Sequence, residues 1–385
     1  MTTLPKLSDR SDIKTFRALD ILKQANEYKE KGIDIARMGA GQPNLGAPQE
    51  ALNYAISKIT SDPRQGYSEA LGMPALRERI ADYYHNYYNV QVSPNNIVVT
   101  AGSSGSFVLD FITAFNAGDR VALITPTYPA YRNILKALNI EAVEIEATAE
   151  DNYQPTLELL KNCGKTFDGI IINSPSNPAG TMIDDNELEK ICNWCDEKNI
   201  CLISDEAYHG ITYGKKAQTA RKYSQNAIIL NTFSKYFAMT GWRLGWSILP
   251  DNMMERIKKL SESLFVSAPT ISQHLAYKIF DHTKELDSYV EEYRKNKEIL
   301  INELPKAGIT DFTTAEGAFY IYANISELSN NSEEFCSKIL NEAHVSLTPG
   351  VDFDLTRGHK YIRICYAGSQ ENIIEACKRL KNWQS

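Results

Sequence analysis

Lys235 is the residue of this sequence best placed for covalent chemistry. It lies in the segment 234–243, shortly after the apolar run 227–230, where we expect a buried strand to end. An amine in this position can bond to a carbonyl cofactor, and the nearby Arg243 can bind the phosphate of that cofactor. Taken alone, Lys235 is better explained as a solvated surface lysine, so its interpretation depends on the rest of the chain.

Other apolar runs share this arrangement and end in polar residues. The runs are 96–100, 120–124, 169–172 and 200–203, and the residues that follow them include Ser103, Ser104, Tyr128, Asn177, Asp205 and Tyr208. Such runs predict strands buried on both faces, and the helix-like stretches between them predict a mostly parallel, helix-covered sheet. Ligands bind outside the carboxyl ends of such strands. We therefore expect these side chains and Lys235 to gather along one edge of the sheet.

Further motifs extend this pattern over nearly the whole chain. In order, they are Gly39-Ala40-Gly41-Gln42-Pro43, Tyr67, Gly102-Ser103-Ser104, Asn177-Pro178, Asp205-Glu206-Ala207-Tyr208, Ser234-Lys235, Arg243 and Arg363. In this order they resemble the class I pyridoxal-phosphate-dependent aminotransferases, the aspartate-aminotransferase-like family. The resemblance implies an α/β enzyme that moves the amino group of an L-amino acid to a 2-oxo acid by a ping-pong mechanism.

The resemblance also implies roles for these residues. Lys235 is the Schiff-base lysine and proton carrier, Asp205 keeps the cofactor's ring nitrogen protonated, and Tyr208 bonds the ring oxygen. The remaining cofactor-binding residues are Gly102, Ser103, Ser104, Tyr128, Asn177, Thr232, Ser234, Arg243 and Tyr67, and the substrate-binding residues are Gly41, Asn177 and Arg363. Burial and the charge of Arg243 both favour a neutral Lys235.

Several of these residues have simpler explanations. Asp205 can be a helix N-cap, Asn177-Pro178 a turn, Tyr128 an ordinary loop aromatic, and Arg363 a partner in a salt bridge. For the phosphate, Gly102, Ser103 and Ser104 precede a helix expected over 107–112, and the unpaired N–H groups at its start suit an anion. The glycine spacing there, and at 39–41, does not match a dinucleotide fingerprint.

Tyr67 matches the family tyrosine that reaches the phosphate from the neighbouring subunit. The resemblance therefore implies a homodimer with shared active sites. Composition excludes other partners: 41 basic against 48 acidic residues give a net charge of −7, which argues against nucleic acid. No apolar run approaches membrane-spanning length, and the first ten residues lack the apolar core of a signal peptide. We expect a cytoplasmic protein.

Seven scattered cysteines fit a reducing compartment. Cys192 and Cys195 lie about a turn apart on an expected helix and are expected to pack with apolar residues, because no further ligands complete a metal site. His209 is the only histidine expected near the active site, and we assign it no role. No metal is expected.

Two domains are expected from the order of elements. Residues 48–280 hold the alternating strands and helices of a large cofactor-binding domain. Residues 1–47 and 281–385 form a smaller α+β domain, with a helix over 12–31. The runs 318–322, 345–347 and 361–365 are expected in one small sheet.

The sequence does not identify the donor amino acid. Dicarboxylic substrates need a second cation, and the only candidate, Arg17, is better explained as an exposed helix residue. Aspartate, alanine, aromatic and aliphatic amino acids remain candidates. A C–S lyase or decarboxylase on the same fold is an alternative, and a non-catalytic regulator is a weaker one.

Overall fold

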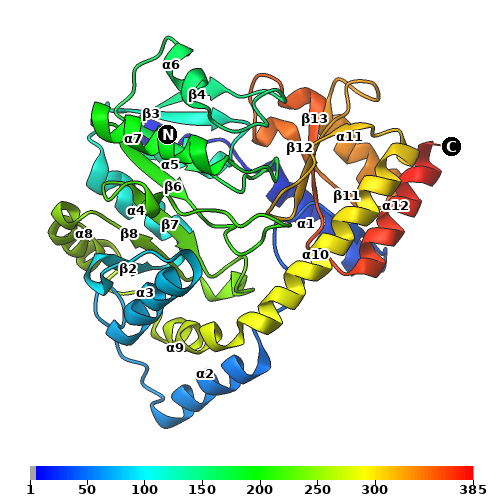
Figure 1. The fold of residues 1–385 in the computed structure, drawn as a ribbon. Helices are drawn as coiled ribbons and strands as arrows, with labels where there is room; N and C mark the ends of the chain where they lie inside the picture. The colour runs from blue at the N-terminus through cyan, green and yellow to red at the C-terminus, as the bar shows by residue number, and fades with distance from the viewer. Residues whose placement is uncertain (1–5, 385) are drawn as a thin grey trace, which may run out of the picture.

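A seven-stranded, mostly parallel sheet forms the centre of the computed structural model, which describes residues 6–384 (Figure 1). Its strands lie in the order β2 (Ile97–Thr100), β8 (Gly245–Ile248), β7 (Ile228–Thr232), β6 (Cys201–Asp205), β5 (Gly169–Asn173), β3 (Arg120–Thr125) and β4 (Glu141–Glu146). Only β8 runs antiparallel to its neighbours. The strands other than β8 therefore share one direction, and their carboxyl ends meet at one edge. The expected α/β fold is confirmed.

Helices cover both faces of this sheet. Alternate strand residues enter two apolar clusters: Val98 joins the cluster of α4 and α8, whereas Ile97 and Val99 join the opposite one with α3 and α7. Because both faces are buried, the strands need apolar residues at every position, which explains the continuous runs in the sequence. The helices of this part are α2 (Gln49–Ser61), α3 (Pro74–Tyr88), α4 (Gly102–Ala114), α5 (Pro129–Ala137), α6 (Leu157–Asn162), α7 (Asp185–Lys198), α8 (Asp251–Leu264) and α9 (Thr270–Ile279).

Two smaller sheets lie beside the large one. One has the order β12 (Thr348–Pro349), β13 (Tyr361–Cys365), β10 (Tyr320–Asn324) and β9 (Asp311–Phe312), all antiparallel. The other pairs β1 (Ala36–Arg37) with β11 (Val345–Ser346) in parallel. The expectation of one sheet for all three C-terminal runs was therefore wrong for 345–347, because the N-terminal segment takes β11 as its partner.

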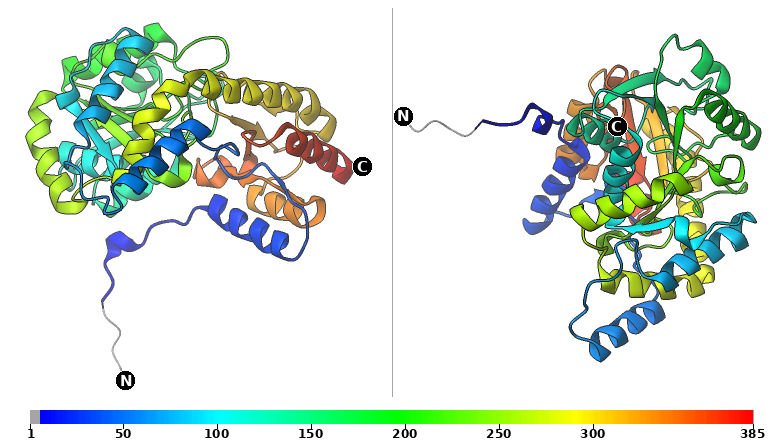
Figure 2. Two further views of the ribbon diagram at one scale, coloured as in Figure 1. Left: turned by 90° about the horizontal axis from the view of Figure 1, so that it is seen from below. Right: turned by 90° about the vertical axis from the view of Figure 1, so that its left-hand side faces the viewer.

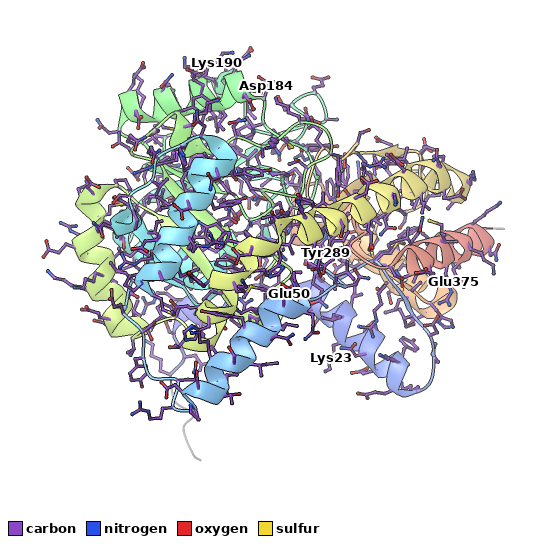
Figure 3. All side chains as sticks on the ribbon, turned by 60° about the horizontal axis from the view of Figure 1, so that its bottom comes forward. Lys23, Glu50, Asp184, Lys190, Tyr289 and Glu375 are labelled. Atoms are coloured by element: carbon purple, nitrogen blue, oxygen red, sulfur yellow. The ribbon has the colours of Figure 1, made fainter. Side chains whose placement is uncertain are left out.

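The long helix α10 (Thr283–Glu303) joins the two groups of strands, and α11 (Ser332–Lys338) and α12 (Gln370–Gln384) pack on the C-terminal side. Figure 3 shows α10, marked by Tyr289, running from beside α2, which carries Glu50, towards the side of α12, which carries Glu375; α7, which carries Lys190, lies apart from it on the large sheet.

Helix α1 (Arg17–Glu30) begins later than the expected residue 12. The preceding residues are held extended by tertiary contacts, since the Lys14 carbonyl accepts a hydrogen bond from Asn133 Nδ2 (2.8 Å). In Figure 2 the segment leading into α1 extends away from the main body. Within residues 6–384, no helix is both long and apolar enough to cross a membrane.

Candidate active site

A cavity of about 280 Å³ lies at the carboxyl ends of the large sheet's parallel strands, next to the small sheets. Its lining includes Gly41, Ser103, Ser104, Tyr128, Asn177, Asp205, Tyr208, Ser234, Lys235, Arg243 and Arg363. The fold therefore brings most of the residues singled out from the sequence into one cavity. Gly102 and Thr232 lie directly behind its wall, and Tyr67 lies outside it.

Lys235 follows β7, and its amine points into the cavity. Its Nζ donates a hydrogen bond to the Gly41 carbonyl (2.7 Å) and lies 5.7 Å from the centre of the Tyr208 ring. Burial lowers the pKa of Lys235 to about 8, and the charges of Arg363 and Arg243 act in the same direction, against Asp205. At pH 7 about a tenth of the amine is therefore neutral and nucleophilic, far more than for a lysine with the ordinary pKa.

Asp205 ends β6 at the floor of the cavity and is 4% exposed. Its carboxylate accepts hydrogen bonds from the Tyr131 hydroxyl and from the Ala207 backbone N–H (3.0 Å). Burial raises the pKa of Asp205 to about 6, while these two hydrogen bonds oppose the rise. A buried carboxylate in this state suits a protonated ring nitrogen as its partner.

The start of α4 and Arg243 form the anion-binding end of the cavity. The N-cap residue Ala101 provides no side-chain acceptor, so the first N–H groups of the helix are open to an anion beside the Ser103 and Ser104 hydroxyls. Gly102 has φ +74°, and an added Cβ would lie 2.5 Å from Arg243 Nη2. Glycine therefore lets the guanidinium approach the helix start closely.

Thr232 does not line the cavity, but its hydrogen bonds position residues at the anion-binding end. Its Oγ1 accepts a hydrogen bond from the Ser234 backbone N–H (3.1 Å) and donates to the Leu244 carbonyl (3.2 Å). It holds the turn that presents Ser234 to the cavity.

Arg363 lies on β13 at the opposite end and is 5% exposed. Its Nη1 donates to Asn177 Oδ1 (3.0 Å) and its Nη2 to the Gly39 carbonyl (2.7 Å). The guanidinium carbon lies 4.5 Å from the Tyr320 ring centre and 4.8 Å from that of Phe353. Its Nε has no hydrogen-bond partner among the described residues. This N–H can donate a hydrogen bond to a planar carboxylate.

Several lining residues were not predicted from the sequence. Tyr131 bonds Asp205, and the Tyr320 hydroxyl bonds that of Tyr208 (2.8 Å). Asn173 donates from Nδ2 to the Asp205 carbonyl (3.0 Å) and accepts from the Asn177 N–H (2.8 Å) through Oδ1. For Asn173 a signal existed, because it ends the apolar run 169–172.

The outer wall was also missed. It consists of Phe16, Ala18, Leu19 and Leu22 from the N-terminal segment and α1, together with Asp352 and Phe353. Arg17 does not belong to it: its side chain pairs with Glu333 (Nε–Oε1 2.7 Å) outside the cavity.

The thiols and His209 take no part in this cavity. Cys192 and Cys195 are buried on α7, where burial raises the pKa of Cys192 to about 12. His209 Nε2 bonds the Ser174 carbonyl (2.9 Å), and burial lowers the pKa of His209 to about 3. Among residues 6–384, no group of three His, Cys, Asp or Glu side chains could hold a metal ion.

Comparison with known proteins identifies the class that this fold and cavity define. The family model "Aminotransferase class I and II" matches residues 33–380. The valine–pyruvate aminotransferase of Mycobacterium tuberculosis is 40% identical over 378 residues, 97% of each chain. The crystal structure of an aminotransferase from Mycobacterium tuberculosis matches with a TM-score of 0.96 at 39% identity, covering 99% of both chains. The aspartate aminotransferase of Thermus thermophilus with maleate matches with a TM-score of 0.92 at 25% identity, covering 98% of this chain and 100% of that one.

The chain belongs to the class I and II aminotransferase family, which confirms the resemblance found in the sequence. It is an aminotransferase, an enzyme of class EC 2.6.1 that transfers an amino group between an amino acid and a 2-oxo acid. Members of this family bind pyridoxal phosphate.

Proposed function

We propose that this aminotransferase uses pyridoxal phosphate held covalently by Lys235. The observation that carries this proposal is the set of three groups in one cavity: the Lys235 amine, the buried Asp205 carboxylate, and Arg243 at the start of α4. They match the aldehyde, the ring nitrogen and the phosphate of the cofactor. When bound, the cofactor supplies an electron sink for the substrate's α-carbon.

Side chains of the protein transfer the protons and hold the cofactor. The neutral Lys235 amine carries the proton from the substrate's α-carbon, and Asp205 holds the proton on the ring nitrogen. Tyr208 and Asn177 bond the ring oxygen, and Tyr128 packs on the ring face. The phosphate is held by Ser103, Ser104, Ser234 and Arg243, with Gly102 and Thr232 shaping their positions.

Arg363 binds the substrate's α-carboxylate, helped by the Gly41 N–H and the Asn177 amide. Its unpaired Nε supports this role. An amino acid and a 2-oxo acid carry the same carboxylate and compete for this single arginine. They must therefore occupy the cavity in turn, which is a ping-pong mechanism.

We further propose a homodimer in which Tyr67 reaches the partner's phosphate site. Tyr67 is 86% exposed, and Ser104 and Arg243 are exposed at the anion-binding end. Exposed apolar residues also lie on the helices that flank the Tyr67 loop: Ile56, Ile59 and Leu264. A second subunit would cover them.

The domain boundaries and the location also remain proposals. We propose a large domain of residues 48–280 and a small one of 1–47 and 281–385, of which 1–5 and 385 lie outside the described residues. All strands of the large sheet fall within 97–248, and those of the smaller sheets at 36–37 and 311–365. Seven free cysteines support a cytoplasmic location.

Borohydride reduction of the holoenzyme followed by peptide mapping tests the central assignment. We expect the cofactor on the peptide that contains Lys235 and none in Lys235→Ala. Label on another lysine of the wild type would refute the assignment.

A further inference from the structure

The outer wall of the active-site cavity is apolar. Phe16, Leu19 and Leu22 line it from the N-terminal segment and α1, and Phe353 lines it beside Arg363. Leu19 is 61% exposed although it faces a binding cavity. A ligand that covered this side chain would gain the free energy of burying its apolar surface.

Each cation that lines the cavity already has a role in binding the cofactor or the substrate's α-carboxylate. Among described residues, only Lys235, Arg243 and Arg363 line it with a positive charge, and each has a role in the proposed function. Arg17, the one other candidate, has its guanidinium on Glu333 (2.7 Å). Among the described residues that line this cavity, no cation is therefore available to neutralise a second carboxylate on a substrate.

The same wall contains a carboxylate. Asp352 is 7% exposed and lines the cavity. Its Oδ1 and Oδ2 accept hydrogen bonds from the backbone N–H groups of Arg17 (3.1 Å) and Ala18 (3.0 Å), so it fixes the first turn of α1 against the cavity. An acidic substrate side chain at this wall would face Asp352 and lack a partner.

We propose that the apolar wall of α1 and Phe353 makes this enzyme select amino acids with uncharged, apolar side chains over dicarboxylic ones. This inference rests on the proposed function, because it takes Arg363 as the α-carboxylate site. With the α-carboxylate on Arg363 and the amine at Lys235, the substrate's side chain extends towards the rest of the lining, whose apolar part includes Phe16, Leu19 and Leu22.

Leucine and aspartate provide the test, because their side chains branch at the same carbon and differ in charge. With purified holoenzyme, we expect kcat/KM for leucine to exceed that for aspartate by about 100-fold or more, since an unpaired charge enters the apolar wall. Inhibition by 4-methylpentanoate and by succinate, which cannot react, should show the same order of affinity.

A cation placed on the wall should shift the preference. In Leu19→Arg, we expect the leucine-to-aspartate ratio to fall about tenfold, because the new guanidinium can pair with the second carboxylate. Leu19→Gln removes the apolar surface without adding charge and should weaken leucine use without improving aspartate use. Gln24→Arg adds the same charge to an exposed position of α1 that does not line the cavity, and it should leave the ratio unchanged.

The outcomes separate the two proposals. Comparable use of leucine and aspartate would overturn the proposed selectivity. An equal shift in Leu19→Arg and Gln24→Arg would also overturn it. Failure of every amino acid to yield a 2-oxo acid would instead refute the proposed function.

Discussion

Lys235 owes its reactivity to burial. The pKa of its amine falls from 10.5 to about 8, so the folded protein disfavours the ammonium form and the neutral nucleophile appears at lower pH. We predict that the rate at which the apoenzyme captures pyridoxal phosphate rises with pH through about 8 and then levels off. Stopped-flow absorbance over a pH series would measure this rate. A midpoint close to 10.5 would show that the cavity does not tune the amine.

Asp205 should matter for turnover far more than for cofactor affinity. Asp205→Asn keeps the size of the side chain but loses the negative charge that holds a proton on the ring nitrogen. We expect kcat to fall about 100-fold or more, because charge stabilisation in the transition state is lost. The dissociation constant of the cofactor should change less than about tenfold, since the phosphate contacts survive.

Tyr131→Phe is the matched variant for Asp205. It removes one hydrogen bond and leaves the carboxylate with its bond to Ala207. The expected loss in kcat is only about fivefold, the value of one such bond. Near-normal turnover of Asp205→Asn would show that this residue only caps the turn after β6.

At the level of residues, the position after an apolar run identified groups that end strands. Groups that reach the cavity from elsewhere were named only through the family resemblance, as Arg363 on β13 was, or were missed. Lys235, Asp205 and Asn177 follow apolar runs and could be found by that position. Tyr320 comes from the middle of an apolar stretch on β10, and its contact with Tyr208 arises only when the small sheet packs against the large one. No local sequence pattern predicts this contact between Tyr320 and Tyr208.

The start of α4 should be sensitive to a single methyl group. Gly102→Ala places a Cβ at positive φ and 2.5 Å from Arg243 Nη2, so the guanidinium must move away from the anion-binding end. We predict that the dissociation constant for pyridoxal phosphate rises about tenfold, because roughly one charge-assisted hydrogen bond to the phosphate is lost.

Gly118→Ala controls for backbone strain. Gly118 also has positive φ (+94°), but nothing lies within 4 Å of the added Cβ. Both variants should lose about 1 kcal/mol of stability in urea unfolding. Only Gly102→Ala should lose cofactor affinity, and an equal loss in both would contradict the role given to the α4 start.

Strands were predictable where a continuous apolar run is buried on both faces. β8 was missed although all of its residues are buried, because Gly245 and Ser247 interrupt its apolar run. The runs of β2, β3, β5, β6 and β7 are continuously apolar. β4 is an edge strand with Glu141, Glu144 and Glu146, and this alternation gave no buried-strand signal. The start of α1 was also missed, because the acceptor that caps it, Asp352, is distant in sequence.

Shared active sites would be visible in mixed dimers of two defective variants. We predict that Tyr67→Ala mixed with Lys235→Ala regains activity, because one site of each mixed dimer would combine an intact Lys235 with the partner's intact Tyr67. Random subunit exchange should restore about a quarter of the wild-type sites. Activity no higher than the sum of the separate variants would place Tyr67 in its own subunit's function.

The most direct test of the whole account is a single half-reaction. Holoenzyme mixed with an L-amino acid such as leucine, without any 2-oxo acid, should release one equivalent of the matching 2-oxo acid per site and then stop. The amino group should stay with the enzyme until a second 2-oxo acid accepts it as a new amino acid. Continuous release of carbon dioxide or ammonia from leucine, or of a thiol when a sulfur-containing amino acid replaces it, would contradict the account and favour a decarboxylase or lyase.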